Sequence, residues 1–137
     1  MMAGALACSL WGCREKIPPG DPFYKEQENL SAIGIEDAWR AGLTGKGVRI
    51  AVIDTGAAGH EDLDEGRISG RSYVDEEESD YNDTRGHGTA VTGILAAGRD
   101  NGTGIAGMTD SEILVLKVLG DQPHIGIDHV AQALRDA

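Results

Sequence analysis

Two nearly continuous apolar runs stand out along the chain, at residues 48–53 (Val-Arg-Ile-Ala-Val-Ile) and 113–119 (Ile-Leu-Val-Leu-Lys-Val-Leu). Apolar, β-branched runs of this kind are typical of parallel strands that are covered on both faces. A weaker strand is predicted over residues 67–74. Apolar positions at helical spacing predict helices, which cover residues 31–41, 87–97 and 127–137. The order strand, strand, helix, strand, helix predicts an α/β fold, a parallel β-sheet flanked by helices.

The remaining segments separate into an N-terminal part, an arm and loops. Residues 14–30 are expected to form an extended arm, because the run Pro-Pro-Gly-Asp-Pro at 18–22 disfavours regular structure. Residues 75–83 are predicted to be a solvated acidic loop. We therefore divide the chain into residues 1–13, the arm at 14–30 and one globular part at 31–137.

Charge and cysteine content exclude some classes of partner and indicate where in the cell the protein is found. The formal net charge of -11 argues against nucleic acid and against anionic membrane surfaces as partners. No apolar run reaches the roughly 18 residues of a membrane-spanning helix. The only cysteines are Cys8 and Cys13, in an apolar segment that resembles the end of an export signal, and residues 10–13 resemble a lipoprotein cleavage box. We expect a secreted or cell-envelope protein, with a stray apolar N-terminus as the alternative.

Candidate chemistry lies at the ends of two predicted elements. Asp54 ends the first apolar strand, and open parallel sheets build their sites at the carboxyl ends of the strands. His87 stands between two glycines where the small-residue helix begins. A carboxylate beside a histidine fixes the tautomer of the ring and supports its charged form, as a general base requires. Asp followed by His provides two members of a nucleophilic triad, and the serine is not recognisable.

The motifs around these residues resemble those of the subtilisin-like serine peptidases, the subtilases, over the N-terminal part of their catalytic domain. The matching segments are residues 21–24 with Gln27, the Asp motif at 45–56, His-Glu-Asp-Leu at 60–63, Gly-His-Gly-Thr at 86–89, and residues 101–107 and 117–119. The resemblance implies that Asp54 orients His87 and that His87 is the general base in the cleavage of polypeptides. In that family the nucleophilic serine and the oxyanion-hole asparagine come later.

None of the six serines lies in such a context: Ser9, Ser31, Ser69, Ser72, Ser79 and Ser111. We therefore expect roughly the first half of a catalytic domain, inactive by itself.

The resemblance also implies a structural calcium site. Family members often hold calcium with a glutamine of the arm, an aspartate after the catalytic one and a loop after the histidine helix. The corresponding residues are Gln27, Asp62, Asp100 and Asn101. Surface residues in turns are the alternative reading. No cofactor is expected for the chemistry, and a zinc site built on His60 lacks the necessary ligand spacing.

Two residues and one segment depart from the family pattern. Ala90 replaces a histidine outside the triad, and Asp110 stands where proline is usual. Residues 122–124 (Gln-Pro-His) replace a glycine-rich strand that commonly pairs with substrate, and proline has no N–H for that pairing.

Two other functions compete with a serine endopeptidase. Residues 53–57 (Ile-Asp-Thr-Gly-Ala) also resemble the active-site motif of retroviral-type aspartic peptidases, an all-β family that pairs two aspartates. The predicted helices have no place in that fold. The second alternative is a truncated or degenerate subtilase homologue that acts as a binding module without catalysis.

Overall fold

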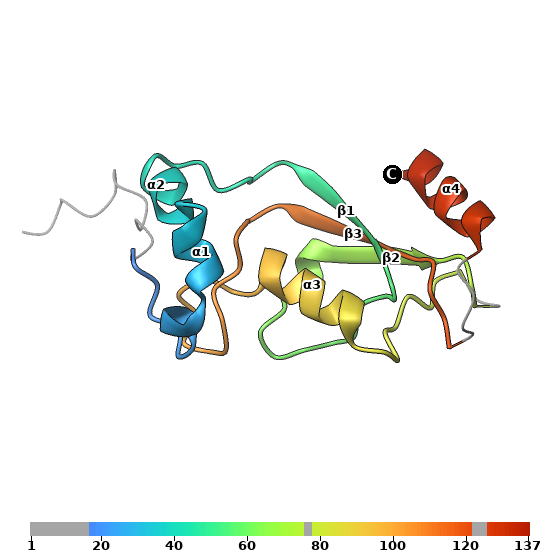
Figure 1. The fold of residues 1–137 in the computed structure, drawn as a ribbon, viewed down its shortest axis with the longest axis horizontal. Coiled ribbons are helices and arrows are strands. Elements are labelled where there is room, and N and C mark those ends of the chain that lie inside the picture. The colour runs from blue at the N-terminus through green and yellow to red at the C-terminus, as the bar shows by residue number, and fades with distance from the viewer. Residues whose placement is uncertain (1–16, 76–77, 122–125) are drawn as a thin grey trace, which may run out of the picture.

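The computed structural model describes residues 17–75, 78–121 and 126–137, and its centre is a parallel β-sheet (Figure 1). The strands are β1 (Arg49–Asp54), β2 (Ile68–Ser72) and β3 (Glu112–Lys117), and their order within the described residues is β1-β3-β2. Both pairings are parallel, with Asp54 and Ser72 each opposite Lys117. The predicted α/β fold is confirmed, and its helices exclude an all-β aspartic peptidase.

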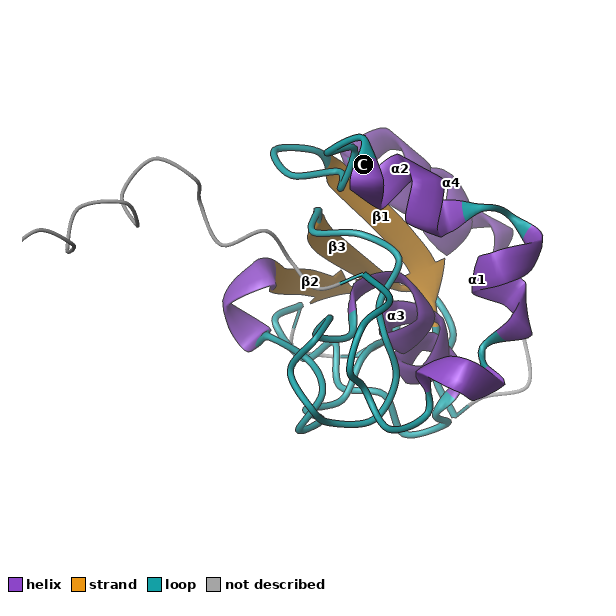
Figure 2. Ribbon diagram, turned by 90° about the vertical axis from the view of Figure 1, so that its left-hand side faces the viewer, coloured by secondary structure: helices purple, strands orange, loops and turns teal. Residues whose placement is uncertain are grey.

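β3 lies between the other two strands, and its side chains alternate between two apolar cores. Ile113 and Val115 pack with Ala96 of α3 (His87–Ala96). Leu116 packs with Ala133 of α4 (Ile127–Asp136). Because successive strand residues point to opposite faces, α3 and α4 cover opposite sides of the sheet (Figure 2). The edge strand β1 contributes Val52 to the first of these cores, and its Ile53 packs against the second.

The predicted single helix over residues 31–41 is instead two helices, α1 (Glu28–Ala32) and α2 (Ile35–Arg40). They are separated by Gly34, which has a φ of 67° in the left-handed region. Glycine adopts this conformation without a steric penalty, so the backbone can turn there. α1 also begins inside the predicted extended arm, after a short 3-10 helix, η1 (Tyr24–Glu26). Burial of Leu30 beside Trp39 and Ala106 accounts for this earlier helix start.

The arm is fastened to a loop that follows α3, about eighty residues later in the sequence (Figure 1). The buried carboxylate of Asp21 accepts hydrogen bonds from the backbone N–H groups of Asp100, Asn101 and Gly102 at 2.8–3.1 Å. A further hydrogen bond joins the Phe23 N–H to the Gly104 carbonyl. These contacts fix the arm against the body of the fold.

An arginine next to this loop joins it to the α1–α2 pair. The guanidinium of Arg99 lies 4.6 Å from the centre of the Trp39 ring and donates to Asp110 at 2.8 Å. Asp110 is the position where the family pattern has proline, and here its carboxylate neutralises a buried cation. Among the described residues, none of the helices has both the length and the apolar character needed to cross a membrane.

Candidate active site

The end of β1 and the first residue of α3 bring Asp54 and His87 together. Nδ1 of His87 lies 2.7 Å from Oδ1 and 2.9 Å from Oδ2 of Asp54. The carboxylate is mostly buried, with 14% of its side chain exposed, whereas 71% of the His87 side chain is exposed. Because a carboxylate only accepts hydrogen bonds, Nδ1 must carry a proton and the neutral ring keeps its lone pair on Nε2. A ring held in this way can take a proton at its exposed nitrogen.

Two threonines bridge the segments that carry the aspartate and the histidine. Thr55, next to Asp54, is buried, and its Oγ1 accepts a 2.8 Å hydrogen bond from the Gly88 N–H. In the opposite direction, Oγ1 of Thr89 accepts a 3.0 Å bond from the Ala58 N–H. Each segment therefore supplies a hydroxyl to the backbone of the other. Neither threonine was predicted as a site residue, because a hydroxyl beside a motif does not show which backbone group it meets.

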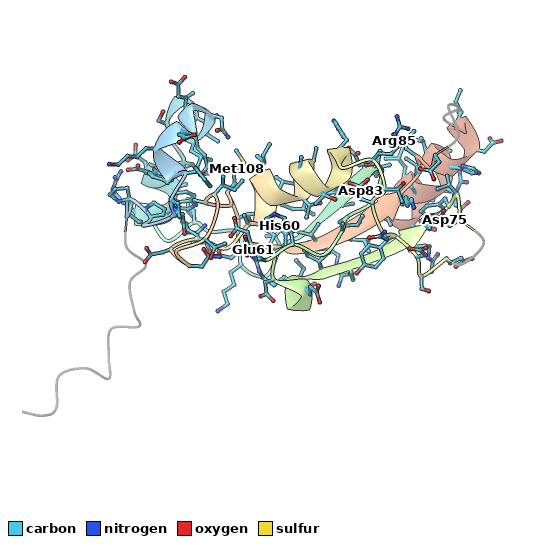
Figure 3. The ribbon with its side chains drawn as sticks, turned by 90° about the horizontal axis from the view of Figure 1, so that it is seen from below. His60, Glu61, Asp75, Asp83, Arg85 and Met108 are labelled. Carbon is cyan, nitrogen blue, oxygen red and sulfur yellow. The ribbon has the colours of Figure 1, made fainter. Side chains whose placement is uncertain are left out.

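Asp83 precedes α3 and lies beside its first turn (Figure 3). Its Oδ1 accepts from the N–H groups of Arg85 and Gly86, and its Oδ2 accepts from the N–H and the hydroxyl of Thr89, all at 2.7–2.9 Å. Burial acts to raise the pKa of Asp83, but the bonds from Thr89, Arg85 and Gly86 outweigh it and hold the pKa well below its usual range. The carboxylate is therefore ionised at neutral pH.

The predicted solvated loop at residues 75–83 is thus wrong at its C-terminal end, whereas Asp75 at the other end is exposed. Asp83 is buried, and Asp75 forms an ion pair at 2.8 Å with Nζ of the buried Lys117. The bond from Lys117, with a second from Ser72, lowers the pKa of Asp75. Lys117 also donates to the Asn82 carbonyl at 2.8 Å. The loop is therefore tied to the central strand close to the point where β1 ends.

Close backbone approach requires a glycine at the start of α3. A Cβ on Gly88 would lie 2.2 Å from the carbonyl oxygen of Gly56, which no real contact allows. Gly56 itself has a φ of 114°, in the range that favours glycine. The two glycines allow the turn after β1 and the first turn of α3 to touch.

The four predicted calcium ligands do not form one ligand set in this structure. Asp62 and Asn101 contact each other through a 2.9 Å bond from Nδ2 of Asn101. The carboxylate of Asp100 instead accepts from the Gly20 N–H, and both amide atoms of Gln27 bond to the backbone of Ala106. The second oxygen of Asp62 accepts from the Ile105 N–H. Calcium takes six to eight oxygen ligands. Asp100 and Gln27 bond to other partners, so the four side chains do not provide one ligand set as arranged, and calcium binding stays a prediction.

Other candidate groups lie apart from the Asp54–His87 pair. His60 and Glu61 follow the turn after β1 (Figure 3), and Nδ1 of His60 accepts from the Asp62 N–H at 3.1 Å. Within the described parts of the chain, no three His, Cys, Asp or Glu side chains surround a common point. Nor does any serine of these parts hydrogen-bond to His87. Residues 122–124 lie outside the described residues.

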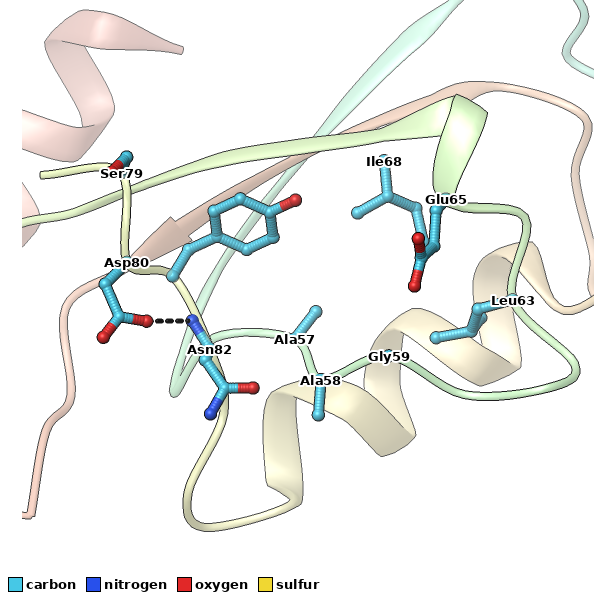
Figure 4. A pocket seen from close by; sticks show the side chains of 10 residues that line it. Ala57, Ala58, Gly59, Leu63, Glu65, Ile68, Ser79, Asp80 and Asn82 are labelled. Carbon is cyan, nitrogen blue, oxygen red and sulfur yellow. Dashed lines mark hydrogen bonds between the residues drawn. The ribbon is translucent and has the colours of Figure 1, made fainter.

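A groove of about 410 Å³ adjoins the turn that follows β1 (Figure 4). Its walls are the turn residues Ala57 and Ala58 and the segment 79–82, and Leu63, Glu65 and Ile68 complete the lining. Asp54 and His87 do not line it.

Comparison with known proteins identifies the family. The profile of the Subtilase family matches residues 45–137. The chain is 47% identical over 96 residues to the Minor extracellular protease Epr of Bacillus subtilis (strain 168), an alignment that covers 69% of the chain and 14% of that protein. It is 38% identical over 100 residues to the Major intracellular serine protease of the same organism, covering 69% and 31%. Subtilisin BL of Lederbergia lenta is 41% identical over 106 residues, covering 77% and 38%.

A solved structure shares the fold. It is described as one of the proteases from Pseudoalteromonas arctica PAMC 21717, and it superposes with a TM-score of 0.73 at 26% identity, covering 85% of the chain and 43% of that structure. The chain thus spans less than half the length of each of these proteins.

Proposed function

Because the chain belongs to the subtilase family, we propose that it carries the acid–base part of a serine endopeptidase site that cleaves polypeptides. The observation that carries the proposal is the contact of 2.7 Å and 2.9 Å between Nδ1 of His87 and the carboxylate of Asp54. Nε2 of His87 would take the proton of a serine hydroxyl as its oxygen attacks the scissile carbonyl, and would return it to the leaving amine. Asp54 would stabilise the imidazolium between these two transfers.

For this reaction the nucleophile and the oxyanion donors would have to be supplied by another segment. The serines of this chain do not lie in the family's motif, and a base without a nucleophile and oxyanion donors has little to activate. We therefore propose that the chain hydrolyses no peptide bonds by itself. Casein hydrolysis by the purified chain that disappears in His87→Ala would contradict this.

The triad assignment is tested by supplying the missing part. The chain is joined to the C-terminal part of Subtilisin BL, a relative of stated identity, at the end of their aligned region. His87→Ala is expected to lower turnover of a peptide substrate by about 10⁴- to 10⁶-fold, because the proton acceptor is lost. His60→Asn is the control. Position 60 lies outside the Asp54–His87 pair, and the asparagine keeps a side-chain acceptor for the Asp62 N–H. Near-normal turnover in His87→Ala would refute the assignment.

A binding module without catalysis is the second candidate. It is favoured by one observation, that the hydroxyls of Ser31, Ser72 and Ser111 donate to Glu28, Asp75 and Gly45 and not to His87. The two candidates differ in the joined protein described above. An active joined protein that depends on His87 supports the enzyme, whereas a folded but inactive one supports the binding module.

For location, we propose export directed by residues 1–13, which lie outside the described residues. Support comes from their apolar composition and from a relative named as extracellular, although another relative is named as intracellular. Expression in a bacterial host tests this. Lipid labelling that disappears in Cys13→Ser would show a lipoprotein, whereas an unprocessed chain in the cytoplasmic fraction would refute export.

A further inference from the structure

Asp83 is a buried carboxylate that the proposed chemistry does not use. It is 8% exposed and accepts four hydrogen bonds, three from backbone N–H groups and one from the Thr89 hydroxyl. Loss of water from a charged group is costly unless it is hydrogen-bonded in this way. Such a set of bonds therefore fixes both the carboxylate and the backbone that donates to it.

The first task of Asp83 is to cap α3. The N-cap residue is Gly86, which has no side chain to accept from the free N–H groups of the first turn. Asp83, three residues earlier, provides that acceptor through its bond to the Thr89 N–H at 2.9 Å. Its negative charge also lies at the positive end of the helix. The helix whose first residue is His87 is thus held at its N-terminus by Asp83.

The second role of Asp83 is to orient a hydroxyl relay, by which we mean the two hydrogen bonds that run from the Ala58 N–H through the Thr89 hydroxyl to Asp83. The Thr89 hydroxyl has one proton, and it donates this proton in a hydrogen bond to Oδ2 of Asp83, 2.7 Å from Oγ1. A carboxylate can only accept, so the direction of this bond is fixed. The hydroxyl oxygen then faces the Ala58 N–H, which donates to it at 3.0 Å. Ala58 belongs to the turn that follows Asp54, so the relay joins the two segments of the proposed pair. Without the carboxylate, nothing fixes the hydroxyl proton on this side.

We propose that Asp83 is a positioning residue for the general base: through Thr89 it holds the start of α3 against the turn after β1, and so keeps Nδ1 of His87 on Asp54. This rests on the proposed function, because it assigns Asp83 a role in orienting His87. It adds a carboxylate that acts on the base through the backbone and a threonine, and that touches no reacting atom.

The test measures the tautomer of the His87 ring in the joined protein described above, labelled with ¹⁵N at histidine, by NMR at alkaline pH where the ring is neutral. In the wild type the Nδ1–H form is expected to dominate, since Nδ1 faces a carboxylate. Asp83→Asn replaces one acceptor oxygen by an amide N–H₂, and Thr89→Val removes the hydroxyl but leaves Asp83. In both variants the Nδ1–H form is expected to become the minority, as in a freely solvated ring.

Matched controls separate positioning from loss of charge or general destabilisation. Asp80→Asn removes the same charge three residues earlier, where the carboxylate is exposed and accepts only from the Asn82 N–H. Thr89→Ser keeps the hydroxyl. Both are expected to keep the wild-type tautomer, and circular dichroism verifies that each variant is folded.

A dominant Nδ1–H form in both folded Asp83→Asn and Thr89→Val would overturn the role of Asp83. If Asp83→Asn does not fold, Thr89→Val alone decides, because it leaves the carboxylate and its backbone bonds in place. A wild type that lacks the Nδ1–H preference would instead contradict the Asp54–His87 pair, and with it the proposed function. The two failures are therefore distinguishable.

Discussion

At the scale of single residues, the ionised state of Asp83 links the candidate site to the stability of the fold. Its pKa is depressed by hydrogen bonds that outweigh burial. A carboxyl with a depressed pKa in the folded state binds protons less readily there than in the unfolded chain. Its stabilising contribution is therefore complete above the ordinary pKa of aspartate, about 4, and is lost as the pH falls toward the lower folded value.

We predict that Asp83→Asn lowers the free energy of unfolding at neutral pH by about 1–3 kcal/mol, because N–H donors lose their acceptor. The difference from the wild type should shrink as the pH falls below about 4, where the wild type loses the contribution of the ionised carboxylate. Urea unfolding of the joined protein at a series of pH values measures it, with Asp80→Asn as the control. All unfolding measurements and melts of variants use this joined protein. A difference that stays constant across the acid range would contradict the predicted linkage.

The sequence predicts the reacting residues better than the residues that hold them. Asp54 and His87 follow from an apolar strand that ends in a carboxylate and from a histidine between glycines. Thr55, Asp83 and Thr89 were missed because their roles depend on backbone groups of another segment. An aspartate shortly before a helix whose cap is glycine is the one signal that points to Asp83.

At the scale of elements, the approach of α3 to β1 depends on one face of small residues. Gly88, Thr92 and Ala96 are the buried residues of this helix and recur every four positions. They form one stripe along the helix, which lets its backbone lie close to the sheet. Gly93 belongs to the same helix, but a Cβ there would meet nothing within 4 Å.

This contrast predicts opposite results for the same substitution. Gly88→Ala should destabilise the chain by about 1–3 kcal/mol, because its methyl group collides with the Gly56 backbone. Gly93→Ala should stabilise it by about 1 kcal/mol, since alanine favours a helix interior. Thermal melts of both variants provide the measurement. A neutral Gly88→Ala would show that α3 can move away from β1 at no cost.

Element boundaries show where local patterns fail. The strands and the helices α3 and α4 start and end within two residues of the predicted bounds. The helix predicted over residues 31–41 is wrong because Gly34 turns into the left-handed region, and periodicity alone does not distinguish a tolerated glycine from a helix break. The early start of α1 reflects the tertiary burial of Leu30, which no local window contains.

At the scale of the whole molecule, the arm is attached through a carboxylate. We predict that Asp21→Asn destabilises the fold by about 1–3 kcal/mol, because the amide group faces a backbone N–H that Oδ2 of Asp21 had accepted. Asp37→Asn is the control, since it removes an exposed ion pair of little value. Thermal melts measure both, and equal melting temperatures would contradict an anchoring role for Asp21.

The same melts, repeated with a chelator and with added calcium, test the calcium prediction. A wild-type melting temperature that rises with calcium, and an Asp62→Asn variant that does not respond, would support calcium at this loop. An unresponsive wild type would refute it. The anchoring role of Asp21 is decided separately, by the melts with chelator.

The unpaired edge of β1 in the described chain and the exposed apolar side chains predict that the isolated chain associates. β1 is an edge strand among the described residues (Figure 2), and Ile94, Ile127 and Leu134 are exposed by 43%, 81% and 64%. Unpaired strand edges and exposed apolar side chains favour association. We expect the isolated chain to elute as aggregates and to bind a dye specific for apolar surface. A monodisperse monomer with a cooperative melt would contradict this and would favour the binding module.

The sequence predicts the class of this fold but not the order of its strands. Continuous apolar runs indicate a parallel sheet, yet β3 enters between β1 and β2 although it comes last along the chain. Residues 48–53 and 113–119 look equally apolar. Their different burial arises because one strand lies at an edge and the other in the centre, and neither run contains that information.

The attachment of the arm also limits when the arm can dock during synthesis on the ribosome. Asp21 emerges early, but the backbone N–H groups of residues 100–102 that hold it are made about eighty residues later. Throughout that interval the arm lacks the backbone donors that hold it in the folded chain. Docking of the arm therefore cannot precede the emergence of the loop after α3 from the exit tunnel.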